Sequence, residues 1–259
     1  MPSVARISVT PLKGTALQHP ERVSLTEAGI AGSRRFHLID AKGRLFSGPV
    51  HGPLVQVEVD HDRAERTLTC RFPDGTVVAG PDDALGAGCE TDFYGRPVPG
   101  HRLDGAFDEA FSAFVGQPVT LVRTDRDGDG VDVFPLTVIS TASVADLGRR
   151  GGYEGVLNPL RFRINIELDG CEPFEEDTWD GRRVAMGDAV VRISGQIPRC
   201  VVTTQDPTTG LRDWNTLKQI ASFRAPLPDR SGVPFGVYAT VDTPGEIAVG
   251  TEVALLDIR

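Results

Sequence analysis

The sequence predicts a mainly β, barrel-like protein with a few helices. Many short segments are β-branched or alternate apolar with polar residues, whereas few segments carry apolar side chains at helical spacing. The 29 glycines and 19 prolines of this 259-residue chain separate the segments at short intervals. This length allows one large domain or two modest domains, each with its own core.

The N-terminal part is expected to form strands joined by tight turns. A turn at Pro73-Asp74-Gly75 joins two of these strands in a hairpin. Residues 81–101 are rich in glycine and proline and show little periodicity, which predicts a loop or short-strand region with a domain boundary near its end. The expected strands are residues 4–11, 22–26, 33–40, 45–47, 54–60, 67–72 and 76–79.

The remaining residues are expected to mix strands with short helices. Phe107, Phe111 and Phe114 recur on one face of a helix over 104–116, which Asp104 can cap and Gly116 can end. Further helices are expected at 141–149 and 213–223, and a capped turn at 158–163. The expected strands are residues 119–123, 136–140, 164–168, 189–194, 201–204 and 235–241, followed by a hairpin-like pair within 245–256.

Composition and charge exclude several classes of function. The formal net charge of −9 argues against nonspecific binding to nucleic acid or to anionic lipid. No apolar run approaches ~18 residues, so no membrane span is expected. The four cysteines form no CxxC pair and the N-terminus has no signal-peptide core, which favours a reducing, cytoplasmic location.

Common catalytic and nucleotide-binding motifs are missing from the chain. It has no GxSxG, HExxH, P-loop or GxGxxG pattern. Residues 125–130, DRDGDG, begin like a calcium-binding loop, but Leu136 stands at the twelfth position where glutamate is needed. We interpret this segment as an acidic, flexible surface loop.

The strongest candidate for chemistry is Cys200, in the stretch QIPRCVVTTQDPTTG at 196–210. A thiolate is both a nucleophile and a metal ligand, and the neighbouring Arg199 can stabilise it. The β-branched run at 201–204 predicts a buried strand with the cysteine at its entrance. A structural, buried cysteine is the alternative. Because all five histidines lie within the first 101 residues, a metal ligand is favoured over a Cys–His nucleophile.

Two further segments could bind an anion. Lys13-Gly14 follows the first strand and can offer an ammonium and backbone N–H groups. Arg34-Arg35 begins another strand and suits a bidentate grip on phosphate or carboxylate. Ordinary exposed turn and strand-end residues are the alternative in both cases.

Residues 198–210, PRCVVTTQDPTTG, resemble the signature of MOSC-domain proteins. That family includes the mitochondrial amidoxime-reducing component and the C-terminal domain of molybdenum-cofactor sulfurase. Four weaker blocks follow the family order: TPLKG at 10–14 is similar to Tyr-Pro-x-Lys-Ser, and 32–40 to Gly-Asp-Arg-Arg-aromatic. RFRINI at 161–166 is similar to Arg-Phe-Arg-Pro-Asn-Ile, and FGVY at 235–238 to Phe-Gly-x-Tyr.

The resemblance implies a β-rich N-terminal domain over 1–103 and a MOSC β-barrel over 104–259. It also implies a molybdenum cofactor, a molybdopterin whose metal is held by Cys200. By the same resemblance, Lys13, Gly14 and Arg34 would hold the pterin phosphate, Arg163, Asn165 and Arg199 would contact the pterin, and Tyr238 would lie near the site.

The chain departs from the family pattern at four positions, all of them in the blocks that would bind the cofactor. Gly14 stands where many members have serine, and Ser33 replaces an aspartate before the arginines. Ile164 replaces a proline, and Pro198 replaces a small polar residue beside Arg199. None of these changes removes the proposed metal ligand.

The function expected from this resemblance is that of a molybdenum-dependent oxidoreductase reducing N-hydroxylated or N-oxide compounds. The scattered cysteines do not provide an iron–sulfur spacing, so electrons would come from an external ferredoxin- or cytochrome-type donor. One alternative is a carrier that holds molybdenum cofactor or sulfur on Cys200 without turning over a substrate. Another is a metal-free cysteine nucleophile.

Overall fold

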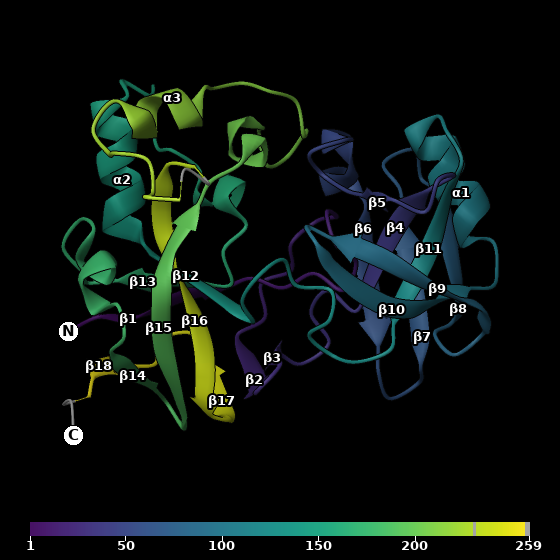
Figure 1. The fold of residues 1–259 in the computed structure, drawn as a ribbon, viewed down its shortest axis with the longest axis horizontal. Helices are drawn as coiled ribbons and strands as arrows, with labels where there is room; N and C mark the ends of the chain where they lie inside the picture. Colours follow the sequence, from purple (N-terminus) through teal and green to yellow (C-terminus); the bar gives the residue numbers. More distant parts are fainter. Residues whose placement is uncertain (230–231, 257–259) are drawn as a thin grey trace.

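The computed structural model describes residues 1–229 and 232–256, and these residues form two lobes (Figure 1). The described residues contain 18 strands but only three α-helices and four short 3₁₀ helices, which confirms the predicted mainly β class. We call the lobe that contains the sheet with the most strands the barrel lobe. The other lobe, built from residues 36–124, is called the hairpin lobe.

The barrel lobe is built around a seven-stranded sheet. Its order is β1 (Ser3–Ile7), β13 (Ile166–Asp169), β12 (Leu136–Ser140), β16 (Pro234–Thr243), β15 (Ala189–Pro198), β14 (Arg183–Met186) and β18 (Val253–Leu255). Ser3 in the first strand forms an isolated bridge with Glu252, beside the last strand, so the sheet is nearly closed into a barrel.

Smaller elements complete the barrel lobe. A three-stranded sheet joins β17 (Gly245–Ala248), β2 (Arg22–Thr26) and β3 (Gly29–Ile30). Helices α2 (Thr141–Arg150) and α3 (Thr216–Ala221) lie together at one end of the barrel (Figure 1). The 3₁₀ helices are η2 (Pro159–Phe162), η3 (Glu175–Trp179) and η4 (Val201–Thr204).

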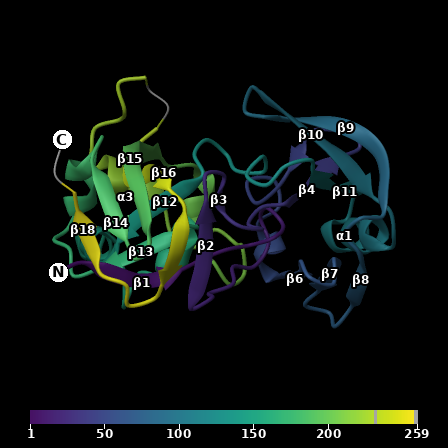
Figure 2. The ribbon, with the colours of Figure 1, turned by 90° about the horizontal axis from the view of Figure 1, so that it is seen from below.

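The hairpin lobe pairs a five-stranded sheet with a three-stranded one. The first has the order β5 (Leu45–Phe46), β4 (Phe36–Asp40), β11 (Val119–Thr124), β10 (Arg96–Leu103), β9 (Leu85–Phe93); the second is β6 (Glu58–Asp62), β7 (Thr67–Arg71), β8 (Val77–Pro81). The 3₁₀ helix η1 (Gly52–Gln56) and helix α1 (Phe107–Val115) complete this lobe. Figure 2 shows the long β9–β10 hairpin reaching toward the barrel lobe.

Each lobe has its own apolar core. The barrel core contains Val138, Ile166 and Val237 from neighbouring strands. In the hairpin lobe Phe107 and Phe111 are buried and Phe114 is partly buried against them, which confirms the predicted phenylalanine stripe. A third cluster beneath α2 and α3 includes residues next to the candidate site described below.

Strand pairing crosses the predicted domain boundary at residues 103 and 104. Strand β11, after that boundary, pairs with β4 and β10 in the hairpin lobe. Strand β1, before it, pairs with β13 in the barrel lobe. The two lobes are therefore not divided at that position. The division of the chain into domains at 1–103 and 104–259 stays a prediction.

Several strands and helices lie where the sequence predicts them. Residues 22–26 and 136–140 are strands with those bounds, and the hairpin around Pro73-Asp74-Gly75 is present as β7 and β8. Helix α2 is confirmed and begins at the Ser140 cap. Helix α1 begins later than predicted, at Phe107, and its cap position is Ala106 rather than Asp104.

Of the two alternatives expected at 81–101, a loop or short strands, the loop is wrong, because this segment forms the β9–β10 hairpin with longer strands than expected. Its prolines at 97 and 99 are tolerated because β11 pairs only with residues 100–102 of β10, so no ladder on that side needs an N–H from either proline; the Pro99 carbonyl still accepts from the Asp125 amide (3.2 Å). The pair predicted within 245–256 is also wrong, since β17 pairs with β2 and β18 with β14. The segment 54–60 begins as η1 and becomes a strand only at Glu58.

Candidate functional site

A cavity of about 440 Å³ lies where the two lobes meet. The hairpin lobe contributes Ser47, Gly48 and Tyr94, and the barrel lobe contributes Cys200 and Tyr238. A pocket of this size suits a small molecule or a cofactor. Further residues that line it include Lys13, Gly14, Arg34, Asp132, Val133, Phe134, Thr137, Phe162, Arg163 and Arg199.

Seven of the eight residues singled out from the sequence line this cavity: Lys13, Gly14, Arg34, Arg163, Arg199, Cys200 and Tyr238. The eighth, Asn165, is buried behind the wall. Its side-chain oxygen accepts a hydrogen bond from Thr137 (3.0 Å), and its amide donates to the Ser8 carbonyl (3.3 Å). Asn165 therefore joins β1 to β12 and can act on the cavity only through its neighbours.

Cys200 is exposed and stands between the end of β15 and the start of η4. The strand predicted at 201–204 is wrong, because these four residues form that 3₁₀ helix. The Thr203 hydroxyl donates to the Cys200 carbonyl (3.0 Å), and the Thr204 hydroxyl donates to the Val201 carbonyl (2.7 Å). Such local hydrogen bonds compete with strand pairing, so they override the extended preference of β-branched side chains.

The loop that follows Cys200 is fastened to the hairpin lobe. The Gln205 amide donates to the Gly48 carbonyl (3.0 Å), and the Gln56 amide donates to the Thr209 carbonyl (2.9 Å). Gly52 and Gly210 pack backbone to backbone, since a Cβ atom built on Gly52 would lie 2.0 Å from the Gly210 oxygen. These contacts hold the cysteine at a fixed place relative to both lobes.

Backbone pairing between 10–13 and 34–36 brings Lys13 and Arg34 together. The Lys13 amide donates to the Phe36 carbonyl (2.9 Å), and the Arg34 amide donates to the Thr10 carbonyl (2.6 Å). Gly14 follows with a φ of +95°, and a Cβ atom there would lie 3.2 Å from the Gly48 nitrogen. A serine at this position, as in many MOSC proteins, would be strained here.

The cavity carries more positive than negative charge. Five cations line it, Lys13, Arg34, Arg161, Arg163 and Arg199, whereas Asp132 is its one carboxylate among the described lining residues. Asp132 forms an ion pair with Lys13. An anionic ligand would therefore gain from cations that the protein itself leaves uncompensated.

Burial shifts the pKa values of the three buried or partly buried cations. Desolvation lowers the pKa of Lys13 to about 8, although Asp132 opposes this shift. Desolvation also lowers the pKa of Arg163 and that of Arg199 to about 10. Burial alone would raise the pKa of Asp132, but Lys13 and Arg34 outweigh it and hold that pKa below its usual range.

The two arginines are held by backbone carbonyls and keep part of their donor capacity free. Arg163 donates to the Thr15 carbonyl (2.6 Å) from a left-handed backbone conformation with φ of 52°. Arg199 donates to the Phe162 carbonyl and lies over the Phe162 ring, 5.3 Å from its centroid. The Nε of Arg199 is buried without a partner, an unusual cost that a ligand in the cavity would relieve.

Among the lining residues that were not found from the sequence, three bear on the proposals below: Tyr94, Asp132 and Phe134. Desolvation of its cavity-facing phenol and the Asp132 carboxylate raise the pKa of the otherwise exposed Tyr94 to about 12, and burial raises the pKa of Tyr238, so both phenols are neutral well beyond neutral pH. Tyr94-Gly95 forms the two-residue tip of the β9–β10 hairpin. The signal in the sequence is the Tyr94-Gly95 pair between two extended segments, which is typical of a hairpin turn. The high glycine and proline content of 81–101 masked this signal.

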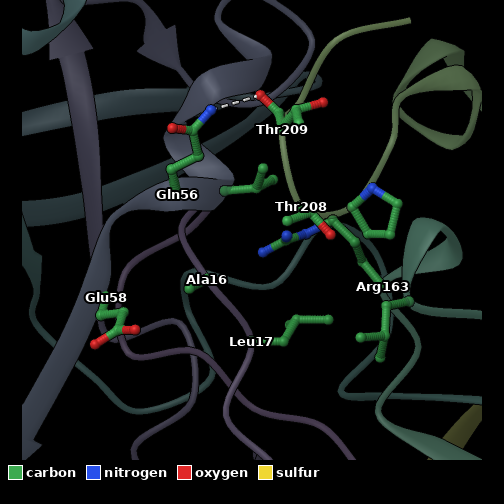
Figure 3. A pocket seen from close by; sticks show the side chains of 10 residues that line it. Ala16, Leu17, Gln56, Glu58, Arg163, Thr208 and Thr209 are labelled. Atoms are coloured by element: carbon green, nitrogen blue, oxygen red, sulfur yellow. Dashed lines mark hydrogen bonds between the residues drawn. The ribbon is translucent and has the colours of Figure 1, made fainter. Parts of the chain in front are cut away.

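A second cavity of about 520 Å³ lies on the other side of Arg163 (Figure 3). Gln56, Glu58, Thr208 and Thr209 help to line it, and Figure 3 shows the Arg163 side chain directed into it. It contains no cysteine and adds a carboxylate opposite its one cation. The cavity beside Cys200 is therefore the better candidate for a reactive centre.

The fold and the cavity together define a two-lobed β protein with a cysteine exposed in a positively charged pocket. Residues 125–254, which is 130 of 259 residues, match the MOSC domain. The chain belongs to the MOSC-domain family.

Several curated relatives are amidoxime-reducing proteins. The chain is 38% identical to mitochondrial amidoxime reducing component 2 of Rattus norvegicus over 128 residues, covering 47% of this chain and 37% of that protein. It is 25% identical to mitochondrial amidoxime-reducing component 1 of Homo sapiens over 283 residues, covering 98% of this chain and 83% of that protein. The match to the rat relative thus spans little more than a third of that protein's length.

Among solved structures, the YuaD protein from Bacillus subtilis is 12% identical with a TM-score of 0.46, covering 98% of this chain and 94% of that one. YiiM from Escherichia coli is 14% identical with a TM-score of 0.35, covering 49% and 56%. Within residues 1–229 and 232–256, no helix has the length and apolar character needed to cross a membrane.

Proposed function

We propose that this chain is a molybdenum-cofactor-dependent oxidoreductase that reduces N-hydroxylated and N-oxide compounds with electrons from a separate ferredoxin- or cytochrome-type protein. The observation that carries the proposal is an exposed Cys200 in the same cavity as five cationic side chains. The names of the rat and human relatives support amidoximes as the substrate class.

The cavity fits such a cofactor. No group of three or more His, Cys, Asp or Glu side chains among the described residues could hold a metal by itself. A metal at Cys200 would therefore need ligands from a cofactor, and a thiolate is a suitable protein ligand for a metal that carries dithiolene sulfurs. The uncompensated charges and the unpaired Nε of Arg199 suit the anionic remainder of the cofactor.

Seven residues singled out from the sequence each have a proposed part in binding the cofactor. Cys200 would hold the metal, Lys13, Gly14 and Arg34 the phosphate, and Arg163 and Arg199 the pterin. Asn165 would support this wall from behind through Thr137 and Ser8. When bound, the cofactor supplies the two-electron chemistry of its metal.

The chain's own residues would bind and orient the substrate. An amidoxime takes up two electrons and two protons, its N–O bond breaks, and an amidine and water are released. The electrons come from the donor protein. Tyr238 is protonated at neutral pH, and its raised pKa reinforces this, so its phenol can donate a hydrogen bond to the N–OH oxygen.

The test is reduction of benzamidoxime by the molybdenum-loaded protein with reduced methyl viologen as an artificial donor. Cys200→Ala should abolish the activity, while Cys171→Ala, at a half-buried cysteine that does not line the cavity, should keep it. Full activity in Cys200→Ala would refute the proposal. The circular dichroism melting curve of each variant controls for unfolding.

The exposure of Cys200 also favours a second candidate, a carrier that holds cofactor or sulfur on this thiol. Cys200 is the one exposed cysteine of the four, so it is accessible to a sulfur donor. A persulfide on Cys200 in the mass spectrum, with no reduction of any N-hydroxylated compound, would support the carrier. Action in the cytoplasm stays a prediction under either proposal.

A further inference from the structure

We propose that Tyr94 is a specificity residue that stacks on a planar aromatic group of the substrate. This inference rests on the proposed reduction of N-hydroxylated compounds and names a substrate class for it. It follows from the way the β9–β10 hairpin presents one aromatic ring to the cavity beside Cys200.

The hairpin tip is held firmly in place. Phe93 and Arg96 form its last strand pair, and Phe93 is buried with the Lys13 ammonium 5.2 Å and the Arg96 guanidinium 5.7 Å from its ring centroid. Arg96 also donates to the Asp129 carbonyl (3.0 Å) and to the Val131 carbonyl (2.5 Å). Figures 1 and 2 both show this tip reaching from the hairpin lobe toward the barrel lobe.

Tyr94 itself is a poor choice for the turn that it occupies. Its φ is 56° and that of Gly95 is 91°, and a two-residue turn with positive φ at both positions favours Asn, Asp or Gly at the first of them. A bulky aromatic residue is rare in this conformation. Tyr94 is also 67% exposed, so it gains little from packing. Folding therefore gives no reason for a tyrosine here, whereas a ligand in the cavity would.

Other residues that line the cavity are also aromatic and apolar. Phe134 and Tyr238 both line it, and their rings lie 4.9 Å apart with an interplanar angle of 33°. Val133, next to Phe134, is 60% exposed and lines the same cavity. Tyr94, Val133 and Phe134 thus form an apolar, aromatic part of the lining, which we call the mouth, besides the charged groups proposed to hold the cofactor.

Such a mouth favours a substrate with a flat, apolar body and a small polar head. The head, an N-hydroxyl group, would lie toward Cys200, and the flat body would lie between Tyr94 and the Phe134–Tyr238 pair. Offset stacking of aromatic rings adds to the gain from burying their area. An aliphatic substrate of equal size would bury similar area but would gain no stacking.

The experiment compares benzamidoxime with cyclohexanecarboxamidoxime, which has the same ring size without planarity. Affinities are measured by ligand-observed NMR on the full-length, molybdenum-loaded, oxidised protein without an electron donor, so binding is read without turnover. The variants are Tyr94→Asn, which suits the turn, and Tyr94→Phe, which keeps the ring. Melting temperatures are recorded in parallel.

We expect Tyr94→Asn to weaken benzamidoxime binding about 2- to 10-fold and to leave cyclohexanecarboxamidoxime nearly unchanged. Tyr94→Phe should retain the affinity of the wild type for benzamidoxime. The melting temperature of Tyr94→Asn should equal or exceed that of the wild type, because asparagine tolerates a positive φ.

Two outcomes would overturn the inference: no change in the affinity for benzamidoxime, or equal weakening of the affinity for both ligands. Tyr94-dependent binding of benzamidoxime without reduction by any donor would uphold the inference and refute the oxidoreductase proposal. Reduction of both ligands, with no effect of replacing Tyr94 on their binding, would refute the inference and uphold the oxidoreductase proposal.

Discussion

Replacing Arg161 should destabilise the protein and loosen the loop that carries Cys200. The Arg161 side chain is completely buried and donates to both carboxylate oxygens of Asp213, at 3.2 and 2.9 Å. It also donates to the Thr203 carbonyl in η4 (3.1 Å) and to the Thr216 hydroxyl at the start of α3 (3.4 Å). One guanidinium thus ties the 3₁₀ helix after Cys200 to α3.

The size of the effect follows from these contacts. Removing one partner of a fully buried ion pair costs about 3–5 kcal/mol. Asp213 is 31% exposed and can be solvated after the change, so the lower end of that range applies. The arginine also lies 5.7 Å from the Tyr153 ring centroid and 5.8 Å from that of Trp214, contacts that Arg161→Met would lose. We expect a loss of about 3 kcal/mol in the free energy of unfolding.

The assay is thermal unfolding followed by circular dichroism. For a chain of this size, a loss of about 3 kcal/mol lowers the melting temperature by about 6–12 °C. Arg161→Lys keeps the charge but not the fork, so it should lie between the wild type and Arg161→Met. Labelling of Cys200 by a thiol reagent should be faster in Arg161→Met. A melting temperature within 2 °C of the wild type, or unchanged labelling, would refute the reasoning about ~3 kcal/mol of stabilisation.

Three further predictions concern the cavity wall. Burial lowers the pKa of Lys13 from 10.5 to about 8, so the unfolded chain binds more protons than the folded chain between these pH values. The free energy of unfolding of the wild type relative to Lys13→Met should therefore rise with pH across this window. Urea titrations at a series of pH values measure this difference, and a constant difference would contradict the prediction. Gly14→Ala should lower the free energy of unfolding by about 1–2 kcal/mol more than Gly75→Ala does. Both glycines have φ near +90°, but only Gly14 has the Gly48 backbone against it. Equal melting temperatures of the two variants would argue against that contact. Asn165→Ala should cost about 2 kcal/mol by leaving the Ser8 and Thr137 groups unpaired, yet folded protein should keep its molybdenum; loss of metal at unchanged stability would instead make Asn165 a direct ligand of the cofactor.

The sequence predicted the fold class and many elements because their signals are local. Residues 136–140 are apolar and β-branched and form a buried strand, and the phenylalanine stripe at 107–114 packs one face of α1 as its period requires. Lys13, Arg34 and Cys200, far apart in the chain, were grouped by the family resemblance, and the structure places them around one cavity.

What the sequence did not predict depends on contacts between distant segments. The β9–β10 hairpin has weak local strand signals, and its pairing with β11 becomes visible only in the folded chain. The 3₁₀ helix η4 forms because threonine hydroxyls and the docking of Gln205 onto Gly48 outweigh β-branched preference. Tyr94 and Asp132 could not be assigned to the cavity before those segments were placed.

The measurement that tests the central claim most directly is the molybdenum content of the purified protein, with Cys200→Ala and Cys171→Ala beside it. The protein is produced in a host supplied with excess molybdate, and metal is measured by mass spectrometry against protein concentration. We predict near-stoichiometric molybdenum in the wild type and in Cys171→Ala, and almost none in Cys200→Ala. Molybdenum retained in full by folded Cys200→Ala, or absent from all three proteins, would contradict the claim that Cys200 holds a molybdenum cofactor in this cavity.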